Sequence, residues 1–294
     1  MTTALESSAD SQPTRVSSRD RASARSHRTQ RPGSAVSAVI TLTWVGLLSF
    51  MREPIAFIMG LLYPLFMLIL FDAVFPGEMA GGITFGEYML PAMITMGVLM
   101  TCMQILAITV SAERETGALK RLSVLPVPAW GYVVAKCVSN TVLSVINIVV
   151  LIVVGRIILG LSLPSSAHSW GLAALALVLT IGACTALGLA IGRLCPSSRA
   201  ASGILTPVVI ILQFVSGLFL PLAQLPSWMV HSFSVLPVRW AAELMREAFL
   251  PASAAAAEPT GAWETGKGLA VVAAWFVGGV VAAVLISRRD TVDR

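Results

Sequence analysis

Residues 132–161 read YVVAKCVSNTVLSVINIVVLIVVGRIILGL, an apolar run with few polar interruptions. About 20 apolar helical residues span a bilayer core, so a helix of this length crosses a membrane with a tilt or projects beyond it. The whole chain has the same character: 56% of its residues are apolar and only 12% are charged, against about 25% charged in soluble domains. We therefore expect an all-α membrane protein.

Five further apolar segments complete a predicted set of six membrane-spanning helices. The six predicted spans are residues 55–74, 88–110, 132–161, 170–191, 203–220 and 268–286. They form a membrane domain over residues 54–287, followed by a cytoplasmic tail at residues 288–294. The loop after the fifth span contains a helix-like stretch, residues 238–250, in which Arg239 and Glu243 are spaced to pair along a helix. We expect this loop to cap the outer face.

The chain begins with a polar segment, residues 1–34, that is rich in Ser, Thr, Arg and Ala and is typical of a disordered basic tail. A signal peptide would have its apolar core close behind a short basic start, so we expect the tail to be retained. The next uncharged stretch, residues 35–51, is long enough for a short span or for an interfacial helix. Because a span here would place the arginine-rich tail outside the cell, we predict an interfacial helix over residues 35–53.

Basic residues gather in the segments that this topology places on one side of the membrane. Between the spans they are Arg114, Lys120, Arg121, Arg193 and Arg199. The two short loops on the other side contain no Lys or Arg. This bias predicts a bacterial-type inner-membrane protein with both termini in the cytoplasm. The net charge of +5 thus reflects membrane topology, and we expect no nucleic-acid partner.

Several kinds of chemistry have no support in the sequence. The second, fourth, fifth and sixth predicted spans have no ionisable side chain in their central portions, which argues against a proton-driven carrier. Residues 261–268 read GAWETGKG and approach a phosphate-binding loop, but Gly268 replaces the Ser or Thr that would hold magnesium. The four cysteines lie in or beside apolar spans and the three histidines lie far apart. We therefore predict no disulfide, metal or cofactor in this chain.

The segment between the second and third spans, residues 111–126, reads SAERETGALKRLSVLP. We expect a short amphipathic helix here, with Glu113 and Glu115 near its start and Lys120 nearer its end, an order that suits the helix dipole. The alternative is an ordinary charged loop, because cytoplasmic loops tend to be basic.

This segment resembles the E-x-x-x-G-T-L-x-x-L-x-x-x-P signature of ABC-2 type permeases, including the daunorubicin-resistance-like multidrug efflux group. Residues 52–54 (REP) resemble the R-D/N-P motif before the family's first span, and residues 135–136 (AK) resemble the start of its third span. Residues 216–237 carry the S-G-x-x-x-P and L-P-x-W elements that follow its fifth span. Ala118 and Leu125 depart from the signature.

The resemblance implies a half-transporter of six helices that pairs with a second permease chain; we expect a homodimer, with a heterodimer as the alternative. Two separate ATPase subunits would sit on its cytoplasmic face and would hold the ATP and magnesium. The segment between the second and third spans would be the coupling helix against the ATPase. The residues expected to act there are Glu113, Arg114, Glu115, Gly117, Leu119, Lys120 and Arg121. A gating or outer-seal motif is expected at Ser216, Gly217, Pro221, Pro226 and Trp228.

Two further patterns are candidates for a translocation path. Asn140 and Asn147 lie seven residues apart on one face of the third span, where they could contact cargo or bond to neighbouring helices. Met96 and Met100 belong to a methionine stripe along the second span, which suits varied apolar cargo and ordinary core packing equally well. Neither pattern identifies a substrate.

Our hypothesis from the sequence is the membrane subunit of an ABC exporter that moves a hydrophobic drug, natural product or lipid-like molecule out of the cell. One alternative is a permease for a polysaccharide or a lipid-linked glycan. Another is a membrane scaffold that recruits a cytoplasmic protein without transport. An intramembrane enzyme is disfavoured, because the sequence has no aspartate-rich cluster, G-x-S-x-G elbow or H-E-x-x-H pair.

Overall fold

The computed structural model describes residues 32–52, 54–79, 82–118 and 129–292. The α-helices are α2 (Pro32–Arg52), α3 (Pro54–Val74), α4 (Phe85–Leu99), α5 (Leu106–Glu115), α7 (Ala129–Ile158), α8 (Ala167–Leu194), α9 (Ser198–Val215), α10 (Ser227–Phe233), α11 (Pro237–Phe249) and α12 (Thr265–Val292). Shorter elements are the π-helix η1 (Met100–Ile105), the 3-10 helices η2 (Leu222–Gln224) and η3 (Ala252–Ala257), and the paired strands β1 (Glu78–Met79) and β2 (Ile83–Thr84). The fold is all-α in character, as predicted.

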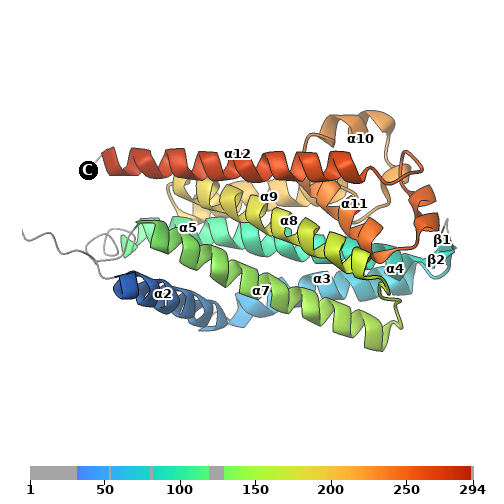
Figure 1. Ribbon diagram of the computed structural model, residues 1–294, viewed down its shortest axis with the longest axis horizontal. Coiled ribbons are helices and arrows are strands. Elements are labelled where there is room, and N and C mark those ends of the chain that lie inside the picture. Colours follow the sequence, from blue (N-terminus) through green and yellow to red (C-terminus); the bar gives the residue numbers. More distant parts are fainter. Residues whose placement is uncertain (1–31, 53, 80–81, 119–128, 293–294) are drawn as a thin grey trace, which may run out of the picture.

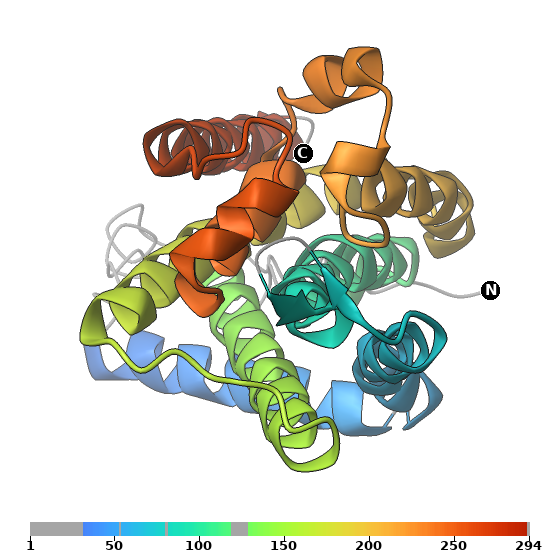
Figure 2. The ribbon, with the colours of Figure 1, turned by 90° about the vertical axis from the view of Figure 1, so that its right-hand side faces the viewer.

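The long helices lie side by side along one axis of the molecule (Figure 1). One of them, formed by α4, η1 and α5 together, is a continuous helix of 31 residues, Phe85–Glu115. Viewed along the axis, α4 lies among α3, α7, α8 and α11 (Figure 2). Every residue of α4 except Glu87 is buried, so this helix is the centre of the bundle. We call the end of the bundle near Glu115 the α5 end, and the end near Phe85 the α11 end.

Five helices among the described residues are long and apolar enough to cross a membrane. They are Phe85–Glu115, Gly131–Ile158, Ala167–Leu194, Ser198–Val215 and Thr265–Ile286. The predicted first span coincides with α3, of which Gly60–Val74 counts as a shorter apolar helix. The chain is therefore a multi-pass membrane protein, and the count of six spans stays a prediction.

α2 covers the stretch predicted to be an interfacial helix and runs obliquely across the start of α7 (Figures 1 and 2). The Ser139 hydroxyl of α7 donates to the Thr43 carbonyl of α2 at 3.1 Å. Trp44 is 63% exposed on the outside of α2. An inclined helix with an exposed aromatic side chain is in keeping with an interfacial position, which stays a prediction. Of the predicted tail, residues 1–31 lie outside the described residues.

Several helices begin about one turn before the predicted spans, because polar caps extend them. At the start of α4, the Thr84 hydroxyl accepts a hydrogen bond from the Glu87 backbone N–H, and the Glu87 carboxylate accepts one from the Thr84 backbone N–H, which completes a capping box. Ser166 and Ser197 cap α8 and α9 through their hydroxyl groups. At the other end of the chain, α12 continues to Val292, past the predicted end of the sixth span.

The predicted end of the fifth span at residue 220 is wrong, since α9 ends at Val215. Gly217 has a φ of +74°, a left-handed conformation that stops the helix. The Leu218 N–H then bonds back to the Gln213 carbonyl at 3.1 Å. A Cβ atom at Gly217 would lie 2.6 Å from the Leu222 Cγ, so both the backbone and the packing require glycine here.

The start of the predicted coupling helix is also wrong. Glu113 and Glu115 occupy the last turn of α5, the same helix that forms the second span. Gly117, with a φ of +71°, follows the end of this helix. The predicted coupling residues Leu119, Lys120 and Arg121 lie outside the described residues.

The helix predicted over residues 238–250 is present as α11, but its predicted ion pair is wrong. The Arg239 guanidinium donates instead to the Val230 carbonyl at 3.0 Å and to the Ser234 hydroxyl. The Glu243 carboxylate accepts the backbone N–H of Glu264 at 2.9 Å. Both side chains therefore fasten α11 to other segments of the chain, and they do not pair with each other.

Two glycines allow α8 to pack closely against the central helix. A Cβ atom at Gly188 would lie 2.6 Å from the Cys102 carbonyl oxygen, and one at Gly192 would lie 2.7 Å from the Ala107 carbonyl oxygen. The spacing is that of a small-x-x-x-small motif, which lets helix backbones approach in a membrane. The Ser111 hydroxyl donates across this contact to the Gly192 carbonyl at 2.9 Å.

The close packing at Gly188 and Gly192 leads us to a prediction about the stability of the protein. Gly188→Ala and Gly192→Ala should each lower the free energy of unfolding by about 1–3 kcal/mol, because the added methyl group forces two backbones apart. Unfolding of the purified protein in detergent would measure the loss. The control is Gly278→Ala in α12, which has no other atoms within 4 Å of the new Cβ. Equal stability of all three variants would contradict the packing role.

Candidate functional site

Three consecutive residues in the last turn of α5 each contact a different helix. They are Glu113, Arg114 and Glu115, and all three belong to the segment that sequence analysis singled out. The helices they reach are α7, α8 and α9. We call these three residues and their contacts the clamp.

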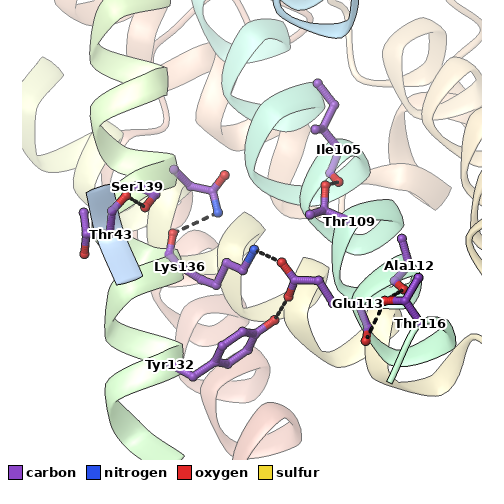
Figure 3. Close-up of polar contacts among 10 residues, drawn as sticks. Thr43, Ile105, Thr109, Ala112, Glu113, Thr116, Tyr132, Lys136 and Ser139 are labelled. Carbon is purple, nitrogen blue, oxygen red and sulfur yellow. Dashed lines mark hydrogen bonds and ion pairs between the residues drawn. The ribbon is translucent and has the colours of Figure 1, made fainter. Parts of the chain in front are cut away.

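The Glu113 carboxylate binds two side chains of α7 (Figure 3). It accepts the Tyr132 hydroxyl at 2.6 Å and forms an ion pair with the Lys136 ammonium at 2.5 Å. Tyr132 and Lys136 lie four residues apart, so both project from one face of the helix. The side chains of Lys136 and Glu113 are 15% and 28% exposed. Because the pair is partly buried, water and salt screen it less than they screen a surface salt bridge. The pair therefore holds the end of α5 against the start of α7.

The Arg114 guanidinium reaches the end of α8, where it donates to the Arg193 carbonyl oxygen. The last four carbonyl groups of a helix have no partner within the helix, and the C-terminal end of its dipole attracts positive charge. Arg114 therefore donates to one of these terminal carbonyls and carries the favourable charge for that position.

The Glu115 carboxylate reaches the start of α9. Its Oε2 atom accepts both the backbone N–H and the hydroxyl of Ser198, each at 3.0 Å. A negative charge at a helix N-terminus interacts favourably with the dipole and with the unpaired N–H groups there. The opposite charges of Arg114 and Glu115 thus match the opposite helix ends that they contact.

The clamp ties the end of the second span to the third, fourth and fifth predicted spans. A displacement of this end of α5 must either move α7, α8 and α9 with it or break charge-assisted hydrogen bonds. Just beyond the clamp, Gly117 has no other atom within 4 Å of a would-be Cβ. Gly117, with its positive φ, thus lies in open surroundings next to a three-helix connection.

The sequence had identified the acidic and basic residues of α5 but not their partners. The clamp residues were predicted to contact an ATPase, and that contact stays a prediction. Tyr132 was missed, although its four-residue spacing from the motif residue Lys136 was a usable signal. Ser198 was also missed, because no local pattern shows that α5 ends beside the start of α9.

The asparagines and methionines of the predicted translocation path make packing contacts within the bundle. Asn140 donates to the Lys136 carbonyl of its own helix at 2.9 Å. Asn147 donates to the Gly60 carbonyl of α3 at 3.1 Å, and it lies against α4. Met96 is fully buried and Met100 is partly buried. These contacts agree with the packing alternative, while contact with cargo stays a prediction.

The residues of the predicted outer-seal motif separate into two groups at the α11 end. Ser216 is fully buried, and Gly217 forms the turn that ends α9. Pro221 precedes η2 and Pro226 precedes α10, whereas Trp228 on α10 is 64% exposed. Ser216 and Gly217 therefore lie inside the molecule, and Trp228 lies on its surface. Among the described residues, no cluster of His, Cys, Asp or Glu side chains is suited to hold a metal ion.

Comparison with known proteins finds a matching region, which includes both the clamp and α11. The family model described as ABC-2 type transporter matches residues 37–250. A search of curated proteins finds no significant match.

A double-mutant cycle tests the clamp itself. Glu113→Gln and Lys136→Met should show a coupling free energy of about 1 kcal/mol in unfolding measurements, because the pair is partly buried and shared with Tyr132. The matched control is the pair of Glu264 and Lys267, whose ammonium side chain is 70% exposed. That cycle should give less than about 0.5 kcal/mol. Equal coupling free energies in the two cycles would contradict a stabilising role of the Glu113 and Lys136 pair beyond that of a surface pair.

Proposed function

Because this chain belongs to the ABC-2 type transporter family, we propose that it is the permease subunit of an ATP-binding cassette exporter driven by a separate ATPase subunit. Its own role is transport, and ATP and magnesium bind the partner. The observation that carries this proposal is the clamp, which joins three helices to the segment nearest the expected coupling helix.

The charge distribution supports an orientation with the α5 end in the cytoplasm of a bacterial-type cell. Arg114, Lys136, Arg193 and Arg199 all lie at or near this end. The loops at residues 75–84 and 159–166, at the other end, contain no Lys or Arg. Short loops follow the positive-inside rule, so the α11 end faces outward and both termini face inward.

In the proposed mechanism, ATP binding closes the two ATPase subunits and displaces the segment that follows Gly117. The positive φ of Gly117 lets the chain change direction between that segment and α5. The clamp then transmits the displacement of α5 to α7, α8 and α9 together. Glu113, Arg114 and Glu115 act mechanically in this scheme, and Lys120 and Arg121 supply the charged contact with the ATPase.

A second copy of the permease completes the transporter. Gln104 of η1 donates to the Thr206 hydroxyl of α9 at 3.2 Å, and Thr206 is exposed on the surface of the apolar bundle. A polar pair facing lipid in a membrane span is costly, so such groups usually face a protein partner or a water-filled cavity. We place the second chain, an identical one, against this face of α9.

The cargo in this proposal is a hydrophobic drug, natural product or lipid-like molecule. The central portions of the second, fourth, fifth and sixth spans have no ionisable side chain, so an apolar cargo suits them better than a charged one. Asn140, Asn147, Met96 and Met100 are the proposed path residues, exposed to cargo only when the helices rearrange. Ser216 and Gly217 belong to the outer seal that this rearrangement opens.

Purification of the tagged protein from its native membrane in mild detergent tests the partnership. A copurifying ATP-binding cassette ATPase, together with ATP-dependent uptake of cargo into inside-out vesicles, would support the proposal. Transport of a glycan in the same vesicles would identify the cargo as a saccharide. A stable cytoplasmic partner without ATP-dependent transport would point to a scaffold and contradict the proposal.

Gly117→Pro should lower ATP-driven transport by about tenfold or more, because proline fixes φ near −65° and cannot adopt the observed turn. The variant should still insert in the membrane and retain the clamp. The matched control is Gly160→Pro, which replaces a glycine of φ +66° with equally open surroundings at the other end of the bundle. Equal transport by the two variants would refute the pivot at Gly117.

A further inference from the structure

A buried ion pair lies at the α11 end, at the opposite end of the central helix from the clamp. Arg246 of α11 donates through Nε to the Glu258 carboxylate at 2.6 Å. The two side chains are 0% and 1% exposed. The other two ion pairs among the described residues are both more exposed. Burial lowers the pKa of Arg246, but Glu258, Tyr88 and Glu243 together raise it by more, so the arginine stays charged.

This pair joins four segments that are distant in the sequence. Tyr88 of the central helix donates its hydroxyl to the same Glu258 oxygen at 3.4 Å, and its ring centroid lies 5.0 Å from the Arg246 guanidinium carbon. The Arg246 Nη1 points to the Gly217 carbonyl, 3.4 Å away, in the turn after α9. Glu258 itself follows η3. The contacts therefore fasten α11 and η3 over the ends of α4 and α9.

Several buried polar atoms at this position have no hydrogen-bond partner among the residues that the structure describes. They are the Arg246 Nη2, the Glu258 Oε2 and the Ser216 Oγ atoms. Ser216 immediately precedes Gly217 and is fully buried. A buried polar atom without a partner is costly, and water would remove this cost if the segments separated. The unpaired atoms thus favour the open arrangement, whereas the ion pair favours the closed one.

The chemistry is poorly suited to a purely structural role. Apolar side chains of similar volume often stabilise a core as well as a buried ion pair or better, because they need no desolvation. Leucine or methionine could have occupied the same space, since Leu244 and Met245 are buried at neighbouring positions of α11. Charged groups that become hydrated when the segments separate stabilise the open arrangement. They therefore reduce the free-energy difference between the closed and the open arrangement.

We propose that Arg246, Glu258 and Tyr88 form a latch that holds α11 and η3 closed over the ends of α4 and α9. Opening of the latch hydrates both charges and uncovers Ser216 and the Gly217 turn. The proposal rests on the proposed function only for the consequence of opening, which is release of cargo at the outer face. The latch itself is a property of this chain and is tested without transport.

The test measures how fast a membrane-impermeant maleimide labels Ser216→Cys in the full-length protein, held in lipid nanodiscs without ATP. Both faces of a nanodisc are accessible, so the result does not depend on orientation. The protein with Ser216 intact reports the background from the four native cysteines. Labelling should be slow while the latch is closed.

Glu258→Gln should speed the labelling by about tenfold or more, because it leaves the Arg246 charge buried without its counter-ion and favours opening. The double variant Arg246→Met with Glu258→Met should label no faster than the protein with an intact latch, since it contains no charge to hydrate. Lys267→Met, which removes an exposed ion pair at the same end, should also leave the rate unchanged.

Equal labelling with and without Glu258→Gln would overturn the latch, and so would a double variant that labels as fast as the single one. The double variant keeps the test decisive if the single variant fails to fold, because it must then fold and stay closed. If the latch controls labelling but no ATPase partner is found, the latch proposal stands and the exporter function is contradicted. ATP-driven transport with latch-independent labelling would do the reverse.

Discussion

The rest of the structure depends on the close contact between the central helix and α8. Gly188 and Gly192 bring the two backbones together at Cys102 and Ala107, and no larger side chain fits there. In a bilayer, helices are not driven together by exclusion of water, so close packing and hydrogen bonds across the contact must hold them. Once α8 is fixed against the central helix, its C-terminus lies beside α5, and the Arg114 contact becomes available.

The continuous helix Phe85–Glu115 places two polar sites at its opposite ends. Its 31 residues correspond to a length of about 46 Å. Tyr88 belongs to the latch at one end, and Glu113 belongs to the clamp at the other. A rigid rod between them would couple the two sites directly. The π-helical segment η1 interrupts the rod near its middle, and such segments are common where a helix must adjust during function.

The sequence predicted five helices that the structure shows to be long and apolar enough to cross a membrane, because apolar runs of this length are rare outside membrane-spanning helices. It placed helix ends poorly, since polar caps such as Thr84 and left-handed glycines such as Gly217 do not affect hydropathy. The family resemblance identified the charged segment at Glu113 but not its partners, because contacts with α7, α8 and α9 depend on how distant helices meet. The pair of Arg246 and Glu258 was not predicted at all. Arg239 and Glu243 have an obvious helical spacing, whereas this buried pair spans two separate elements.

The most direct test of the central claim, that the clamp moves as one unit, is a pair of spin-label distances in the complex with the proposed ATPase. One pair, at Thr116 and Val134, spans the clamp, and the other, at Ile157 and Trp228, spans the exposed α11 end. Trapping the complex with an ATP analogue should change the first distance by no more than about 2 Å and the second by about 5 Å or more. A clamp distance that changes while the second distance stays constant would contradict the account.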